Sequence, residues 1–192
     1  YRVTGVDASE EMLDLAREHA GLADESVTFV PSTYADLPRA VSGGADGLYC
    51  LGNALAAAGS RQGVAEAVAA FAASLRPGGR LFIQVLNFEP MRAEGFCVRG
   101  PRVSVVDGRE LVSVRHFHCA RDTAEVTNIT LFNEDGWRMR SHRGTLYPLR
   151  LDELRGWCAE NGLRVDDVWG GYDRQPLDPK TSIDLILVAT RE

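Results

Sequence analysis

The chain has 192 residues, of which 45% are hydrophobic and 25% are charged. These values are typical of one globular domain, alone or with an elaboration, and a core of this size needs no disulfide or structural metal. The formal net charge of -6 argues against a protein that binds nucleic acid phosphates or anionic lipid.

The sequence contains no apolar run long enough to span a bilayer and no basic segment followed by an apolar leader. Its cysteines are widely spaced and form no CxxC pair: Cys50, Cys97, Cys119 and Cys158. We therefore expect a cytoplasmic protein with reduced thiols. The expected partner is a small-molecule substrate, without nucleic acid or membrane, and the expected state is a monomer or a homodimer.

The first half of the chain alternates apolar segments with helical ones. Strands are expected at residues 1–6, 27–30, 47–51 and 80–85. A helix is expected from Ser9, whose hydroxyl can cap free N–H groups, to Gly21. A second helix is expected at residues 62–75, stopped by residues 76–79. Continuous apolar strands between helices are typical of an α/β fold with a parallel sheet covered on both faces.

The pattern changes after Asn87. Residues 103–106 and 110–118 flank Asp107-Gly108, a strong two-residue hairpin signal. Strands at 124–132 and 137–146 then complete an expected antiparallel meander. The last part of the chain predicts a helix at 151–161 and a closing antiparallel strand pair at 163–169 and 182–190.

Polar residues follow four of the predicted strands, where an open parallel sheet binds its ligands. Asp7 follows the first strand and could accept both hydroxyls of a ribose, or could simply cap a helix. Tyr34 follows the second and could stack on a heterocycle or pack on the core. Gly52-Asn53 and Asn87 follow the third and fourth strands.

Three segments resemble a known family: residues 6–13 (VDASEEML), 46–55 (DGLYCLGNAL) and 75–81 (LRPGGRL). They are similar to motifs of the class I S-adenosylmethionine-dependent methyltransferases. The segments LGNA and LNFE, with a β insertion after them, resemble the glycine and sarcosine N-methyltransferase branch. The resemblance implies a Rossmann-like class I methyltransferase sheet of the seven-stranded type, with an antiparallel β insertion.

The resemblance also implies a domain organisation. Residues 1–95 and 146–192 are expected to form the S-adenosylmethionine-binding Rossmann-like domain, and residues 96–145 the β insertion that covers the acceptor site. The sequence opens inside an apolar strand. The family's first strand and glycine-rich loop are therefore expected to be absent from this sequence, which leaves the domain N-terminally incomplete. The strands around Val3 and Leu48 then lack a common neighbour.

The resemblance assigns S-adenosylmethionine as the cofactor. The resemblance implies that Asp7 binds the ribose and that Ala8 lies beside it. Thr33 is expected at the edge of the adenine ring and Tyr34 on its face. The backbone of Leu51 and Gly52 is expected to contact the methionine part. Asn53 is expected near the methyl acceptor, and Asn87 and Tyr147 along its pocket. An oxygen acceptor would need a general base, for which His116 and His118 are the candidates.

Two departures from the family pattern affect these roles. Thr33 stands where the family usually has Asp, so the contact to the adenine amino group is weaker or made differently. Leu86 stands where the glycine-type enzymes carry an arginine for the substrate carboxylate. Glycine is therefore a doubtful acceptor, although arginines in or near the insertion could still hold an anionic group.

The sequence thus predicts a methyltransferase enzyme that acts on a small-molecule acceptor, with an amine nitrogen as the expected methyl acceptor. The alternative is a catalytically degenerate methyltransferase fold that binds a ligand or a partner. An NAD-dependent oxidoreductase is least favoured, since no catalytic Tyr-Lys pair is visible. No metal site is predicted, because His116 and His118 would share one strand face while Cys119 faces away.

Overall fold

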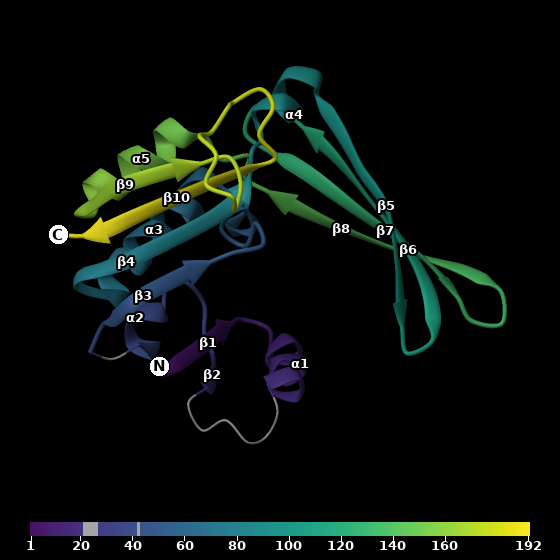
Figure 1. Cartoon of the computed structure of the whole chain (residues 1–192), viewed down its shortest axis with the longest axis horizontal. Coiled ribbons are helices and arrows are strands. Elements are labelled where there is room, and N and C mark those ends of the chain that lie inside the picture. Colours follow the sequence, from purple (N-terminus) through teal and green to yellow (C-terminus); the bar gives the residue numbers. More distant parts are fainter. Residues whose placement is uncertain (21–26, 42) are drawn as a thin grey trace.

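The computed structural model describes residues 1–20, 27–41 and 43–192, and this part of the chain contains three β-sheets (Figure 1). The sheets have the strand orders β1-β2, β3-β4-β10-β9 and β5-β6-β7-β8. β1 and β3 belong to different sheets and are not hydrogen-bonded to each other. In the described residues no helix is long and apolar enough to cross a membrane.

The N-terminal unit consists of β1 (Val3–Asp7), α1 (Glu10–Ala20) and β2 (Val27–Pro31), and the two strands are parallel. The helix begins where the sequence predicts. The Ser9 hydroxyl accepts a hydrogen bond from the Met12 N–H at 3.3 Å, and two glutamates occupy the first turn. Both features stabilise the positive end of a helix. Gly21, the predicted end of the helix, lies outside the described residues.

The main sheet contains β3 (Ala45–Cys50), β4 (Leu75–Leu86), β10 (Asp184–Arg191) and β9 (Leu163–Trp169). β3 and β4 are parallel, while β10 is antiparallel to both β4 and β9. The closing antiparallel pair and the α/β fold class are therefore confirmed.

Helices pack against one face of this sheet: α3 (Arg61–Ser74) and α5 (Leu151–Glu160). They bury a core of apolar side chains that includes Phe71, Leu81, Ile83, Val85, Leu154 and Leu187. The short α2 (Leu37–Ala40) and the 3-10 helix η1 (Leu55–Ala58) complete this half of the chain.

The sequence predicts that residues 76–79 separate a helix from a strand. In the structure these residues instead form a bulge within β4. Ala45 of β3 pairs with Leu75, and Gly47 pairs with Arg80. β4 therefore advances by five residues where β3 advances by two. Gly78 has a φ of 78°, in the left-handed region that glycine adopts without steric cost. The prediction of a turn was right about the local geometry and wrong about the start of the strand.

The third sheet follows α4 (Glu89–Glu94) as an antiparallel meander of β5 (Phe96–Val106), β6 (Arg109–Cys119), β7 (Ala124–Asn133) and β8 (Trp137–Leu146). Asp107 and Gly108 both have positive φ values, 51° and 74°, which is the geometry of a two-residue hairpin turn. The predicted meander is thus confirmed, and it projects away from the main sheet (Figure 1).

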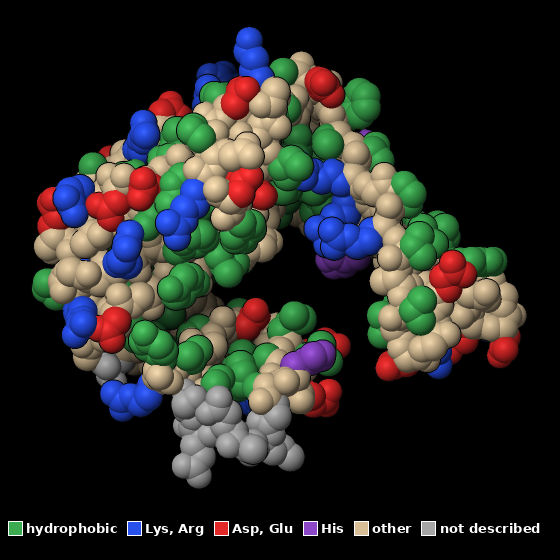
Figure 2. Space-filling view, viewed as in Figure 1, with side chains coloured by type: hydrophobic (Ala, Val, Ile, Leu, Met, Phe, Trp, Pro, Cys, Tyr) green, Lys and Arg blue, Asp and Glu red, His purple; other side chains and the backbone are tan. Residues whose placement is uncertain are grey.

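The pleat gives the meander two faces that differ in chemistry. The inner face carries Phe117 and Val126, which join the main core near the base of the sheet. The outer face carries Val98 and His116 instead, together with exposed apolar side chains. In Figure 2 hydrophobic side chains cover the outer side of the meander. Arginine and histidine side chains gather on the side that borders an open hollow between the meander and the rest of the molecule.

Candidate active site at the strand ends

The carboxyl ends of β1 and β3 point toward the hollow (Figures 1 and 2). At the end of β1, Asp7 Oδ1 accepts a hydrogen bond from the Ser9 N–H at 2.8 Å. The capping alternative is therefore observed. The Asp7 side chain nevertheless remains exposed, as does Ala8 beside it. One carboxylate oxygen thus fixes the start of α1 while the other stays accessible to a ligand.

The residues after β2 make contacts among themselves and with the core. The Thr33 hydroxyl donates to Asp36 Oδ2 at 3.2 Å, so a carboxylate that was not predicted to take part lies beside Thr33. The Tyr34 ring packs edge-on against Phe71 with centroids 5.3 Å apart, and its hydroxyl lies 3.9 Å from Cys50 Sγ. Burial raises the pKa of the Tyr34 hydroxyl well above its usual value. This is the core-packing alternative for Tyr34, and its contacts give no support to a position on an adenine face.

The turn after β3 has the most constrained backbone of the site. Gly52 and Asn53 both have left-handed φ values, 67° and 68°, which is uncommon for Asn. The Gly52 N–H donates to Gln84 Oε1 at 2.7 Å, and the Gln84 amide nitrogen donates to Asp184 Oδ1 at 2.8 Å. The buried Gln84 side chain of β4 therefore links the turn after β3 to the first residue of β10.

This arrangement bears on the expected role of Leu51 and Gly52. The Gly52 N–H is engaged by Gln84, and the Leu51 carbonyl accepts from the Ala54 N–H at 3.2 Å. Two of their backbone groups thus already have partners within the protein, and the contact of these residues with a methionine part stays a prediction. Open space lies over the turn, because a Cβ added to Gly52 would meet no atom within 4 Å.

Asn53 and Asn87 hold the strand ends together. Asn53 Oδ1 accepts from the Leu86 N–H at 3.0 Å. The Asn87 side chain is 2% exposed and donates to the carbonyls of Pro179 (3.1 Å) and Ser182 (2.9 Å). Its Oδ1 accepts from the Glu89 N–H at 3.2 Å. These contacts use both ends of the Asn87 amide, so the side chain has a structural role; its expected place along the acceptor pocket stays a prediction.

Tyr147 is likewise committed to structure. Its hydroxyl donates to Glu153 Oε1 at 2.8 Å, and Glu153 also accepts from Arg61 Nε at 3.1 Å. The ring packs against Trp157 with centroids 6.5 Å apart. Burial, followed by the hydrogen bond to Glu153, raises the pKa of Tyr147 to about 12. The side chain therefore anchors the segment before α5, and this structural role argues against its expected place along the acceptor pocket.

His116 and His118 lie on the outer face of the meander. They flank Phe117, which is 2% exposed and points into the core, so alternation along β6 directs both histidines away from the hollow. The prediction that they share a face is confirmed. This orientation argues against the two histidines as bases for an oxygen acceptor held in the hollow. Within the ranges 1–20, 27–41 and 43–192, no group of three or more His, Cys, Asp or Glu residues could hold a metal ion.

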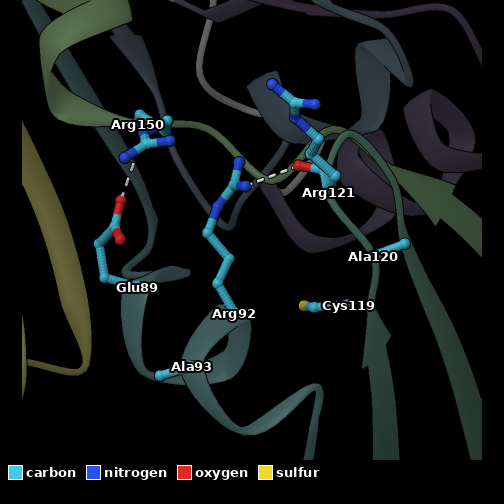
Figure 3. Close-up of a pocket in the computed structure, with 7 residues that line it drawn as sticks. All are labelled: Glu89, Arg92, Ala93, Cys119, Ala120, Arg121 and Arg150. Carbon is cyan, nitrogen blue, oxygen red and sulfur yellow. Dashed lines mark hydrogen bonds and ion pairs between the residues drawn. The ribbon is translucent and has the colours of Figure 1, made fainter.

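A pocket of about 450 Å³ lies at the junction between the meander and the main sheet (Figure 3). It is lined by Glu89, Arg92, Ala93, Cys119, Ala120, Arg121 and Arg150. Arg92 donates to the Arg121 carbonyl at 2.6 Å and to the Pro148 carbonyl, while Arg150 pairs with Glu89 at 3.6 Å. These contacts join α4 to the β6–β7 turn and to the segment before α5, so the pocket belongs to a structural junction.

A second, smaller pocket of about 170 Å³ adjoins the end of β4. Asn87 and Ser182 line one side of it, and Cys97 and Arg99 of β5 line another. Lys180 contributes a second positive charge, and Glu94 contributes a negative one. This pocket connects the strand ends of the main sheet with the inner face of the meander.

Comparison with known proteins gives this geometry a context. Residues 1–79 match the family model of a methyltransferase domain. A glycine/sarcosine N-methyltransferase from Parasynechococcus marenigrum (strain WH8102) is 25% identical over 179 residues, which cover 93% of this chain and 61% of the relative. The chain therefore spans less than two thirds of the length of that relative.

Solved structures agree over the whole chain. CalS10, an amino pentose methyltransferase from Micromonospora echinaspora, is 24% identical with a TM-score of 0.75. The match covers 100% of this chain and 74% of CalS10. The sugar N-methyltransferase KedS8 from Streptoalloteichus sp ATCC 53650 is 22% identical with a TM-score of 0.70, over 98% of this chain and 70% of KedS8. The chain has the class I methyltransferase fold.

The strand ends of this methyltransferase fold suit S-adenosylmethionine, the cofactor that the resemblance implies. An exposed carboxylate oxygen of Asp7 can accept ribose hydroxyls. The carboxylate of Asp36, beside Thr33, can accept from an adenine amino group. The open space over Gly52 admits a ligand close to the backbone. The sequence analysis did not predict a role in the site for Gln84, Asp184 or Asp36. For Gln84 the available signal was its polar side chain within the otherwise apolar strand 80–85.

The packing of Tyr34 leads to a first test. Tyr34→Phe keeps the ring against Phe71 and removes only the contact with Cys50, so we expect the free energy of unfolding to change by less than about 1 kcal/mol. Tyr34→Ala should lower it by about 3 kcal/mol, because a partly buried aromatic ring is lost. Urea denaturation measures both. A Tyr34→Phe variant as unstable as Tyr34→Ala would contradict the packing role of the ring.

Proposed function

We propose that the protein transfers a methyl group from S-adenosylmethionine to an amine nitrogen of a small molecule. The observation that carries this proposal is the set of strand ends: the exposed carboxylate of Asp7 and the open turn at Gly52, in a chain with the class I methyltransferase fold. The amino pentose and sugar N-methyltransferases among its structural neighbours and the glycine/sarcosine N-methyltransferase support a nitrogen acceptor.

S-adenosylmethionine, when bound, supplies a methyl group already activated on a sulfonium. The protein's contribution is then mainly binding and alignment. Asp7 would accept the ribose hydroxyls, and Thr33 with Asp36 would contact the adenine edge. Gln84 fixes the turn at Gly52, which would hold the methionine part. A neutral amine attacks without a general base, which agrees with the position of His116 and His118 on the outer face.

The acceptor proposal makes a prediction about glycine. Leu86 is partly buried against the core at the position where a carboxylate-binding arginine is expected. Burying a carboxylate without a partner is strongly unfavourable. We therefore expect kcat/KM for glycine to be at least about tenfold lower than for a larger amine such as an amino sugar. A methyl-transfer assay on a panel of amines measures this difference.

The matched variant for this assay is Leu86→Arg, which should raise the activity on glycine and leave S-adenosylmethionine binding within about twofold of the wild type. Glycine as the best acceptor of the panel would contradict the proposal. A larger amine as the best acceptor, together with a gain on glycine in Leu86→Arg, would support it.

A second candidate is a catalytically degenerate member of the fold that binds a ligand or partner without turnover. The engagement of the Gly52 N–H by Gln84 favours this candidate, since the amide is not free for a ligand. It predicts S-adenosylmethionine binding without methyl transfer to any amine of the panel. A cytoplasmic location and a monomeric or homodimeric state remain predictions.

A further inference from the structure

The inner face of the meander carries a concentration of positive charge beyond its buried base. The register places Arg99 opposite Arg115, and the same row continues through Asn128 to His142. The next row places Arg102 and Arg140 beside Ser113 and Thr130. Arg138 follows next to Phe132. We call this set the arginine face: Arg99, Arg102, Arg115, Arg138, Arg140 and His142.

The charges of the arginine face are not balanced by the protein. β5 to β8 place no Asp or Glu on the inner face. Among the described residues, no ion pair involves any of the five arginines. Like charges directly opposite each other on neighbouring strands destabilise a sheet. A protein with a net charge of -6 therefore keeps an unfavourable cluster of cations on one face, which indicates an anionic ligand.

Arg99 also has an unpaired hydrogen-bond donor. Its Nε is buried and has no hydrogen-bond partner among the described residues. Arg99 lines the pocket of about 170 Å³ at the end of β4, together with Lys180 and one acidic residue, Glu94. An unpaired buried donor is costly, and an anion in this pocket would satisfy it. Arg140, by contrast, already lies over the Phe132 ring at 4.9 Å.

The position of the arginine face relates it to the strand ends. Basic and histidine side chains of the meander border the hollow, and the carboxyl ends of β1 and β3 point toward the same hollow (Figures 1 and 2). A molecule held by the arginine face would therefore share this space with a cofactor held at Asp7 and Gly52. This position fits the acceptor and not the methyl donor.

We infer that the arginine face is a subsite for an anionic group of the acceptor that carries two or more negative charges, a phosphate or a diphosphate. Guanidinium groups bind phosphate oxygens through paired N–H donors. Arg99, Arg102 and Arg115 lie on the adjacent strands β5 and β6, so their guanidinium groups match several oxygens of one ligand. A single carboxylate would need only one such group. The assignment of this ligand to the acceptor rests on the proposed methyltransferase function, while the anion site itself does not.

The test uses inorganic pyrophosphate as the probe, with binding to the protein measured by calorimetry at low ionic strength. Arg115→Met removes one exposed guanidinium of the face and should weaken pyrophosphate binding about tenfold. Arg143→Met is the matched control: it removes an exposed arginine of the outer face, in β8, and should leave the dissociation constant within about twofold. Binding should also weaken as salt is raised.

Absence of pyrophosphate binding to the wild type, or equal loss in Arg115→Met and Arg143→Met, would overturn the anion site. Pyrophosphate should further inhibit methyl transfer competitively against the amine and not against S-adenosylmethionine. Competition against S-adenosylmethionine alone would overturn the assignment to the acceptor. Pyrophosphate binding that depends on Arg115, in a protein without methyl transfer, would refute the proposed function and leave the anion site standing.

Discussion

Asp7→Ala is expected to weaken S-adenosylmethionine binding by about 1.5–3 kcal/mol, or roughly ten- to hundredfold, the range for hydrogen bonds to a charged group. The reason is the loss of the exposed carboxylate at the end of β1, which we propose accepts both ribose hydroxyls. Calorimetry with S-adenosylmethionine measures the effect.

The matched control for Asp7→Ala is Asp14→Ala, which removes an exposed carboxylate of α1 that pairs with Arg17 at 2.6 Å. Exposed ion pairs contribute little to stability, and the dissociation constant should stay within about twofold. An unchanged dissociation constant in Asp7→Ala, with the fold intact, would contradict the ribose assignment.

Gln84→Leu is expected to lower the free energy of unfolding by about 2–4 kcal/mol. The substitution leaves the Gly52 N–H and the Asp184 carboxylate without their partner, and each unsatisfied group costs about 1–3 kcal/mol. Cofactor binding should weaken as well, because the left-handed turn at Gly52 and Asn53 loses its support from β4. Urea denaturation and calorimetry measure the two effects.

Gln62→Leu provides the comparison, since Gln62 is exposed on α3 and its side-chain amide donates to Glu66 Oε1 at 2.8 Å. Its effect on stability should stay within about 0.5 kcal/mol. A Gln84→Leu variant as stable as Gln62→Leu would mean that the link between β3, β4 and β10 does not hold the turn.

Local patterns predicted most of the fold, because each depends on near neighbours in sequence. The strands 137–146 and 163–169 were predicted to the residue, and the Asp107-Gly108 signal located the first hairpin of the meander. The predicted meander nevertheless began at residue 103, whereas β5 begins at Phe96. A proline at position 101 and a register shift between Arg99 and Arg102 interrupt the alternation there.

The site was less predictable, since residue types do not reveal their distant partners. Asn87 looked like a ligand-binding amide at a strand end, but its partners lie 92 and 95 residues further along the chain. Alternation predicted that His116 and His118 share a face, but only the packing of Phe117 shows that this face is the outer one. Gln84 was overlooked as one polar residue in an apolar strand, although it holds the turn at Gly52.

The most direct measurement of the central claim is a crystal structure of the protein with S-adenosylhomocysteine. The account predicts that the ribose hydroxyls lie within hydrogen-bond distance of the Asp7 carboxylate, with the sulfur over the turn at Gly52 and directed toward the hollow. The ligand bound without contact to Asp7 and Gly52, for example in the pocket lined by Arg92 and Arg150, would contradict it.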